Sequence, residues 1–128
     1  MKASKFQFVK PYLVELNFVA NPDFDTENTS IEMQNSFSVQ INRSENENLA
    51  KVELTLESNM KNDDVPFRVK ATVASEFKWE DLDEKSVESM LNLNAPALLL
   101  GYMRPIVANV TNSSCFPAYN LPFINFTE

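Results

Sequence analysis

The chain has 128 residues, of which 44% are hydrophobic and 10 are phenylalanine, so it is long enough for one domain with a buried core. A single glycine excludes a glycine-rich phosphate loop and the dinucleotide fingerprint, since both need several glycines at fixed offsets. Histidine, the commonest general base and metal ligand, is absent, and one cysteine cannot form an intrachain disulfide or a cysteine-rich zinc site. We therefore expect a single domain over residues 1–128 that is not an enzyme and has no catalytic residues, metal site or cofactor.

The charge balance restricts the partners. Lys and Arg number 11 and Asp and Glu number 18, which gives a formal net charge of −7. Nucleic acid and anionic membranes repel such a chain, so neither is expected as a partner. The N-terminus lacks the apolar core of a signal peptide, and no stretch approaches the roughly 18 apolar residues that span a bilayer. These features predict a cytoplasmic protein.

Four segments alternate between apolar and polar residues, the pattern of strands with one buried face. The first covers residues 5–20, with apolar side chains at even positions from Phe6 to Ala20. Pro11 interrupts it and predicts a bulge or bend at a sheet edge, because proline cannot donate to a ladder. The other segments cover residues 31–41, 52–60 and 67–79. Clean alternation and short connections predict a four-stranded antiparallel meander with one covered face.

Helical sequence follows the last strand. Asp83 is expected to cap a short helical turn over residues 83–91, and Asn94 to cap a main helix that ends near Asn112. Pro96 fits the first turn of that helix, whereas Pro105 inside it should kink it or remove the hydrogen bond back to Gly101. The predicted apolar stripe of the helix consists of Leu99, Met103, Ile106 and Val110.

Small residues form a second line on this helix. Ala97, Gly101 and Ala108 fall roughly opposite the apolar stripe, and Leu100 and Val107 flank them. One interpretation is a weakly amphipathic surface helix. We favour a second one, in which the small residues contact the helix of another subunit, because one helix on one sheet has no second partner within the chain.

The reactive and charged side chains favour structural roles. The carboxylate pairs Asp63/Asp64 and Glu80/Asp81 lie in predicted turns with no apolar wall to raise a pKa, so we interpret them as solvated. Cys115 has no histidine to activate it and is expected to be a packed, inert thiol. Arg104 is expected to have a structural role, pairing with a buried acid or with a carbonyl group of a partner.

Aromatic residues are more numerous than one helix over four strands requires. Phe24 stands alone in the polar loop at residues 21–28, and further aromatic residues follow the main helix, namely Phe116, Tyr119, Phe123 and Phe126. They either complete the edge of the core or line an exposed apolar groove that binds other chains. The residues alone leave both alternatives open.

Several of these segments resemble the protein-export chaperone SecB family. The residues Pro96-Ala97-Leu98-Leu99-Leu100-Gly101-Tyr102-Met103-Arg104, then Phe116-Pro117-Ala118-Tyr119-Asn120-Leu121 and Ile124-Asn125-Phe126, resemble the family's helix and tail at matching spacing. Phe6-Gln7 and Glu15-Leu16-Asn17-Phe18 resemble its first strand. The resemblance implies an α+β fold with a four-stranded antiparallel sheet, a long helix on one face, and a dimer of dimers with the helices between the sheets. It also implies an ATP-independent cytosolic holdase for unfolded polypeptides and preproteins.

The resemblance also assigns residues. The implied client-binding groove contains Phe24, Phe37, Val39, Ile41, Tyr119, Leu121 and Phe123. Export members of the family continue into a second helix and a tail that contacts the SecA translocase motor, whereas this sequence ends at Glu128. Of the acidic sheet positions that dock the motor, only Glu15 is retained, and the others align with Val19 and Lys70.

Three functions follow from the sequence. The first is a holdase for non-native chains, with a role in protein export. The second is a dedicated chaperone of a toxin–antitoxin system that binds one partner, an antitoxin. The third is a small-molecule enzyme of hotdog type, for which the sequence offers no evident catalytic acid.

Overall fold

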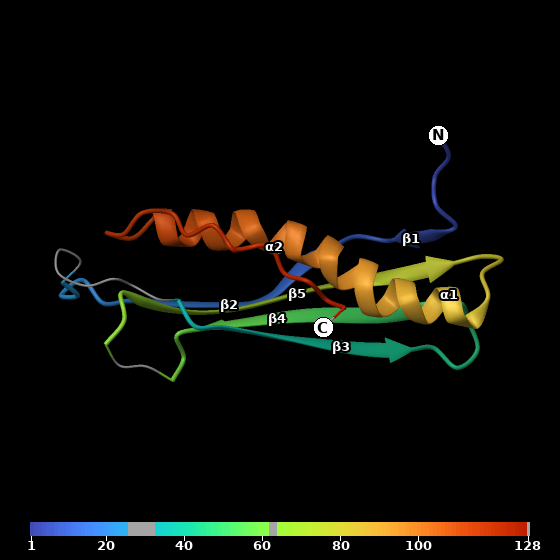
Figure 1. The fold of residues 1–128 in the computed structure, drawn as a ribbon, viewed down its shortest axis with the longest axis horizontal. Coiled ribbons are helices and arrows are strands. Elements are labelled where there is room, and N and C mark those ends of the chain that lie inside the picture. Colours follow the sequence, from blue (N-terminus) through green and yellow to red (C-terminus); the bar gives the residue numbers. More distant parts are fainter. Residues whose placement is uncertain (26–32, 62–63, 128) are drawn as a thin grey trace.

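Five antiparallel strands form one sheet, and a helical segment crosses one of its faces (Figure 1). The computed structural model describes residues 1–25, 33–61 and 64–127. The strands are β1 (Phe6–Phe8), β2 (Tyr12–Ala20), β3 (Asn35–Arg43), β4 (Leu49–Ser58) and β5 (Phe67–Trp79). The helices are α1 (Glu84–Ser89), the π-helix η1 (Met90–Asn94) and α2 (Ala95–Asn112). The predicted α+β class, with one long helix on an antiparallel sheet, is confirmed. Ile31, in the predicted second strand, lies outside the described residues.

The first predicted strand is divided at Pro11, and its two pieces, β1 and β2, both pair with β5. A β-bulge follows between Leu13 and Glu15. Leu13 lies opposite the buried Val73, so Leu13, rather than Tyr12, shares the helix-covered face. The even-position pattern therefore fails at Tyr12, because the irregularities at the break and the bulge move side chains between the two faces.

The order of strands across the sheet is β1-β5-β4-β3, and β2 also lies beside β5. Three strands, β3 to β5, form a meander as predicted. The first strand segment instead lies against β5, so β2 and β3 are at opposite edges of the sheet (Figure 1). The expected complete meander is corrected here. Alternation reveals which face of a strand is buried, but it does not reveal which strand is its neighbour.

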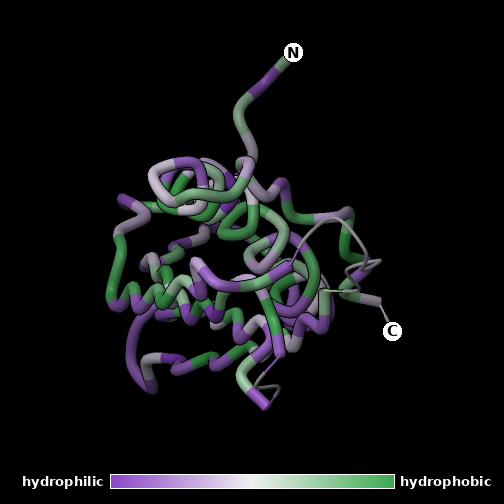
Figure 2. The backbone as a smooth tube through the Cα atoms, turned by 90° about the vertical axis from the view of Figure 1, so that its left-hand side faces the viewer, coloured by the Kyte–Doolittle hydropathy of each residue, from purple (hydrophilic) through white to green (hydrophobic). Residues whose placement is uncertain are grey.

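The core lies between the helices and the facing side of the sheet. Its largest contribution from strands comes from β4 and β5, with the buried residues Ala50, Val52, Leu54, Leu56, Phe67, Val69, Ala71, Val73, Phe77 and Trp79. The other face is more polar, and there the hydroxyl oxygens of Thr55 and Thr72 are 2.8 Å apart. Hydrophobic and hydrophilic residues alternate along the strands in Figure 2. The expectation of one covered face is confirmed.

The helical segment begins as predicted but is not interrupted. The Asp83 carboxylate accepts a hydrogen bond from the backbone N–H of Ser86 at 2.9 Å and caps α1. Asn94 has helical backbone angles and makes no capping bond with its side chain, because η1 runs directly into α2. The predicted N-cap at Asn94 is therefore wrong. Pro96 does lie in the first turn of α2, and α2 ends at Asn112 as expected.

The buried face of α2 is rotated from the predicted one. Leu99 and Met103 are buried as expected, but Ile106 and Val110 are only half-buried. Two residues expected beside the small line are buried instead, namely Leu100 and Val107. The face of α2 that packs on the sheet therefore includes Leu100 and Val107, which were predicted to flank the line of small residues.

Pro105 does not end α2. The helix continues through it, and both Pro105 and Gly101, whose carbonyl lacks the Pro105 N–H as a donor, are exposed. Exposure lets water satisfy that carbonyl group. The cost of proline inside a helix is therefore reduced at this position.

Candidate functional site

The chain after α2 turns back along the helix and crosses towards the sheet (Figure 1). The backbone N–H of Tyr119 donates to Thr111 Oγ1 at 2.8 Å, and Thr111 Oγ1 in turn donates to the carbonyl of Val107 at 2.8 Å. Arg104 donates from Nη2 to the Pro122 carbonyl at 2.9 Å and from Nε to the Leu121 carbonyl at 3.4 Å. Arg104 thus has a structural role, as expected, but its acceptors are carbonyl groups of its own chain rather than a buried acid or a partner's carbonyl.

A second set of contacts ties this segment to the sheet. The Tyr119 hydroxyl accepts a hydrogen bond from Asn35 Nδ2 at 2.7 Å, and Asn35 Oδ1 accepts one from the Ser58 hydroxyl. Leu121 is buried in the core, with 5% of its surface exposed. Residues up to Pro122 are therefore fixed to both the helix and the sheet.

An apolar groove follows the helix-side face of the edge strand β3. Phe37, Val39 and Ile41 lie opposite the core residues Leu56, Leu54 and Val52 of β4, which places all three on the covered face. They border a cavity of about 400 Å³. We call this cavity the β3 groove, and its walls are Phe37, Val39, Ile41, Asn92, Ile124, Asn125 and Phe126. Val39 is 39% exposed, so the floor of the groove is accessible.

A second cavity of about 560 Å³ lies where the first loop meets the segment after α2. We call it the loop cavity, and its walls are Pro22, Phe24, Met33, Pro66, Phe67, Cys115, Phe116, Pro117, Ala118 and Tyr119. The ring of Phe67 lies 6.0 Å from that of Tyr119 and 6.4 Å from that of Phe116. Among the described residues, the lining is mostly apolar and contains no charged side chain. It can therefore accommodate large apolar side chains with little chemical selectivity.

The structure divides the predicted groove residues among four places. The three on β3 line the β3 groove, while Phe24 and Tyr119 line the loop cavity. Leu121 belongs to the core, and Phe123 is 87% exposed and borders neither cavity. The predicted set did not include Asn92 and Ile124, which border the β3 groove. The alternation of Ile124 and Phe126 around Asn125 was the available sequence signal for Ile124.

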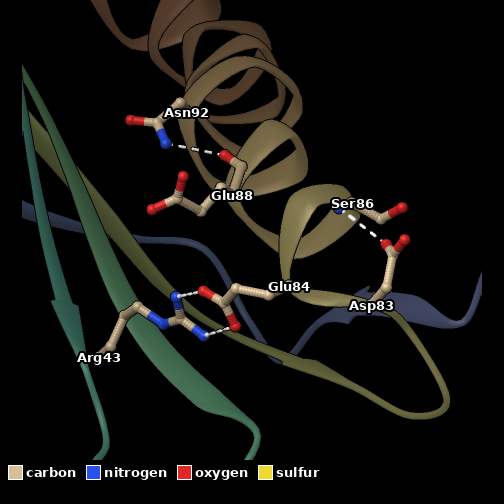
Figure 3. A network of polar contacts seen from close by, with 6 residues as sticks. All are labelled: Arg43, Asp83, Glu84, Ser86, Glu88 and Asn92. Atoms are coloured by element: carbon tan, nitrogen blue, oxygen red, sulfur yellow. Dashed lines mark hydrogen bonds and ion pairs between the residues drawn. The ribbon is translucent and has the colours of Figure 1, made fainter.

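An ion pair joins the end of β3 to α1 (Figure 3). The Arg43 guanidinium at the end of β3 makes a two-point contact with the Glu84 carboxylate in α1 and lies 5.5 Å from the centre of the Trp79 ring. The hydrogen bond lowers the pKa of Glu84 and raises that of Arg43. Further along the helix, Asn92 donates to the Glu88 carbonyl at 2.7 Å. These contacts hold α1 and η1 over the end of β3.

The predicted subunit-contact residues lie at the surface of the protomer. Ala97 and Gly101 are exposed and Ala108 is half-buried. A Cβ atom built on Gly101 would meet nothing within 4 Å, so this face of α2 is uncovered. Large apolar side chains are also exposed along the edge strand β2, namely Leu13, Val14, Leu16 and Val19.

The remaining predicted positions are ordinary surface groups. Glu15 points to the polar side of the sheet, where Lys70 Nζ lies 3.6 Å from its carboxylate. Cys115 is exposed rather than packed, which corrects the expected burial of its thiol. Asp64, Glu80 and Asp81 are exposed as expected, and Asp63 lies outside the described residues.

The described part of the chain, residues 1–25, 33–61 and 64–127, lacks a metal-binding cluster and a membrane-spanning helix. Within these ranges, no three side chains of the ligand types His, Cys, Asp and Glu gather in a way that could hold a metal ion. No helix in the same ranges is long and apolar enough to cross a membrane.

Two curated proteins are similar to this chain in sequence. The chain shares 29% identity over 125 residues with protein-export protein SecB 1 of Francisella tularensis subsp. novicida, covering 95% of this chain and 84% of the relative. It is also 38% identical to SecB of Anaplasma phagocytophilum, over 48 residues that cover 38% of this chain and 30% of the relative.

A solved structure has the same fold. It is a SecB-like chaperone of Mycobacterium tuberculosis in complex with a ChAD peptide from the HigA1 antitoxin, with a TM-score of 0.77, 14% identity and coverage of 94% of this chain and 91% of that one. The family model described as preprotein translocase subunit SecB matches residues 1–128. Since that match spans the whole sequence, the chain belongs to the SecB family.

Proposed function

We propose that this protein is an ATP-independent chaperone that holds non-native polypeptides in the β3 groove and the loop cavity. The observation that carries the proposal is the pair of open cavities lined mostly by apolar residues, one at each end of the segment 115–126. An extended polypeptide can place large side chains in both without needing a defined sequence.

The charge of the protein supports the same function. No charged side chain is among the wall residues that the structure describes for either cavity, whereas the whole chain carries a net charge of −7. A strongly acidic surface keeps a protein with exposed apolar surface soluble. Binding by apolar burial alone needs no catalytic group, cofactor or nucleotide, and it suits clients that are unfolded in the cytoplasm.

We also propose that the protein assembles as a dimer of dimers through α2. The uncovered line of Ala97, Gly101 and Ala108 would allow the helix of a second copy to approach closely, because small side chains keep the two backbones near one another. The exposed apolar residues of β2 offer a second surface for such contacts.

A dedicated chaperone for an antitoxin is the second candidate. Two observations favour it over a role in export. The M. tuberculosis protein with the same fold was solved with an antitoxin peptide. Glu15, the one residue proposed to dock the SecA motor, has Lys70 at 3.6 Å, where a cation partly neutralises its charge.

Suppression of aggregation tests the main proposal. The protein should keep a chemically unfolded client soluble after dilution, as followed by light scattering. Val39→Lys places a charge in the β3 groove and should abolish most of this effect. Gln40→Lys introduces the same charge on the opposite face of the same strand and should retain it. Equal activity of the two variants would remove the β3 groove from the mechanism.

The choice of client separates the two candidates. A general holdase should protect several unrelated unfolded proteins at similar ratios of chaperone to client. A dedicated chaperone should ignore them and bind an antitoxin-derived peptide tightly, as measured by calorimetry.

A further inference from the structure

Residues 123–127, which we call the C-terminal strap, lie over the face of β3 that the proposed function assigns to clients. Ile124 and Phe126 are half-buried, contact the hydrophobic core and border the β3 groove. Phe123 and Asn125, which alternate with them, are exposed. The strap therefore presents apolar side chains two residues apart to the groove, as an extended segment does.

Polar and core contacts fix the chain just before the strap. Before it, Arg104 holds the carbonyl groups of Leu121 and Pro122, and Leu121 is buried. Within the described part of the chain, the strap's own hydrogen bonds are local and run from Thr127 to Asn125, with none to the backbone of β3. Side-chain burial thus holds the strap in place, and the backbone of β3 on that edge stays free of it.

We propose that the strap, which forms one wall of the present cavity, covers part of the β3 face that a client would bind, and that this face accepts extended client segments with large apolar side chains at positions i and i+2. This inference rests on the proposed function. The strap shows the pattern that the groove accommodates, namely Ile124 and Phe126 around an exposed Asn125. A client with the same spacing would displace the strap and take its place.

The tether gives the strap an advantage that a client must overcome. A segment joined to its site by a short linker has an effective concentration on the order of millimolar. The strap is held by two half-buried side chains, so a client that also fills the loop cavity gains contacts the strap does not make. Val39 remains 39% exposed beside the strap and offers a first contact for the client.

A labelled peptide with the sequence of residues 121–127 provides the probe, and its fluorescence anisotropy reports binding. Two variants open the groove, a deletion of residues 123–128 and the double substitution Ile124→Ser and Phe126→Ser. If the strap occupies the groove nine-tenths of the time, each should bind the peptide about tenfold more tightly than the full chain. Phe123→Ser, which removes an exposed aromatic side chain from the same strap, should give no such increase.

The spacing rule needs a second peptide. Both peptides of this comparison carry Phe123→Ser, which leaves Ile124 and Phe126 as the one pair of large apolar side chains two residues apart. Exchanging Asn125 and Phe126 then makes the two apolar side chains adjacent, so only one can face the groove, and binding to the deletion variant should weaken. Leu121 is the last buried residue of the core, and Ile124 and Phe126 only pack half-buried against its edge, so the variants should fold, and thermal unfolding checks this.

Each outcome decides between the two proposals. If the full chain binds the peptide as tightly as the deletion variant, or more tightly, the proposed role of the strap is wrong while the proposed function stands. Equal affinity of the two peptides overturns the spacing rule. Failure of every variant to bind either peptide overturns the proposed function together with the strap.

Discussion

Asn59 donates a hydrogen bond from Nδ2 to the carbonyl oxygen of Phe67 at 3.0 Å, from a left-handed backbone position with a φ of 61°. Its Oδ1 accepts a hydrogen bond from the backbone N–H of Gln34 at 3.0 Å, and its own N–H donates to the Gln34 carbonyl at 2.9 Å. One buried residue after β4 thus joins the approach to β3 and the start of β5.

This geometry predicts a large loss of stability for Asn59→Ala. The substitution leaves the Gln34 N–H and the Phe67 carbonyl unpaired and keeps a Cβ atom at positive φ, so we expect a loss of about 2–4 kcal/mol in the free energy of unfolding. Asn59→Gly loses the same hydrogen bonds but adopts positive φ freely, so it should be less harmful by about 1 kcal/mol. Urea denaturation measures both, and equal losses would show that the backbone angle is unimportant.

Thr111 should control attachment of the segment after α2. Thr111→Val preserves the shape of the side chain but leaves the Tyr119 N–H without its acceptor, which should cost about 1–2 kcal/mol in the free energy of unfolding. Limited digestion with chymotrypsin should then cut faster after Tyr119, whose next residue is Asn120. Thr111→Ser keeps the hydroxyl and should digest at the wild-type rate. A Val variant that resists the protease as well as wild type would contradict this role.

The Arg43–Glu84 pair predicts an acid-sensitive contribution to stability. The pKa of Glu84 is lowered from its ordinary 4.5, so the pair stabilises the fold above about pH 4.5 and loses this effect as pH falls through the lowered pKa. Glu84→Gln should therefore have a lower Tm than wild type at neutral pH, and the gap should close in acid. Glu45→Gln, in an exposed turn, is the control for loss of a carboxylate. A gap in Tm that is constant with pH would rule out the ion pair as its source.

Two substitutions at Gly101 test the stability of α2 and the assembly of the oligomer separately. Since a Cβ atom at this position meets nothing within the protomer, Gly101→Ala should stabilise α2 by about 1 kcal/mol, seen as a higher Tm. Gly101→Leu fits the protomer equally well but would keep a second helix at a distance, so it should lower the oligomer's mass in multi-angle light scattering. An intact oligomer with leucine at this position would contradict the proposed contact through Ala97, Gly101 and Ala108.

The sequence predicted the strand segments well and their arrangement only in part. Period-two alternation located β3, β4 and β5, and the proline at position 11 marked the division between β1 and β2. The place of β2 beside β5 was missed because it depends on contacts between segments distant in the chain. The cap predicted at Asn94 was wrong for a different reason, since η1 runs directly into α2 and no helix begins there.

The candidate site was predicted to a similar degree. Phe37, Val39 and Ile41 share one face because of simple alternation, and they do line one groove. Leu121 and Phe123 could not be placed, because the segment after α2 lacks regular periodicity and its path depends on Arg104 and Thr111. Single contacts of this kind leave no pattern in a sequence.

The π-helix η1 has a consequence for the rotational phase of the whole helical segment. Val87 in α1 and Ala95 in α2 are both buried, although eight residues of regular α-helix would set them about 80° apart around the axis. The wider turn of η1 removes most of that difference, because its i→i+5 bonding turns the chain less for each residue. A version of this chain with one residue fewer between positions 89 and 95 should therefore form a continuous α-helix that presents the same face to the sheet.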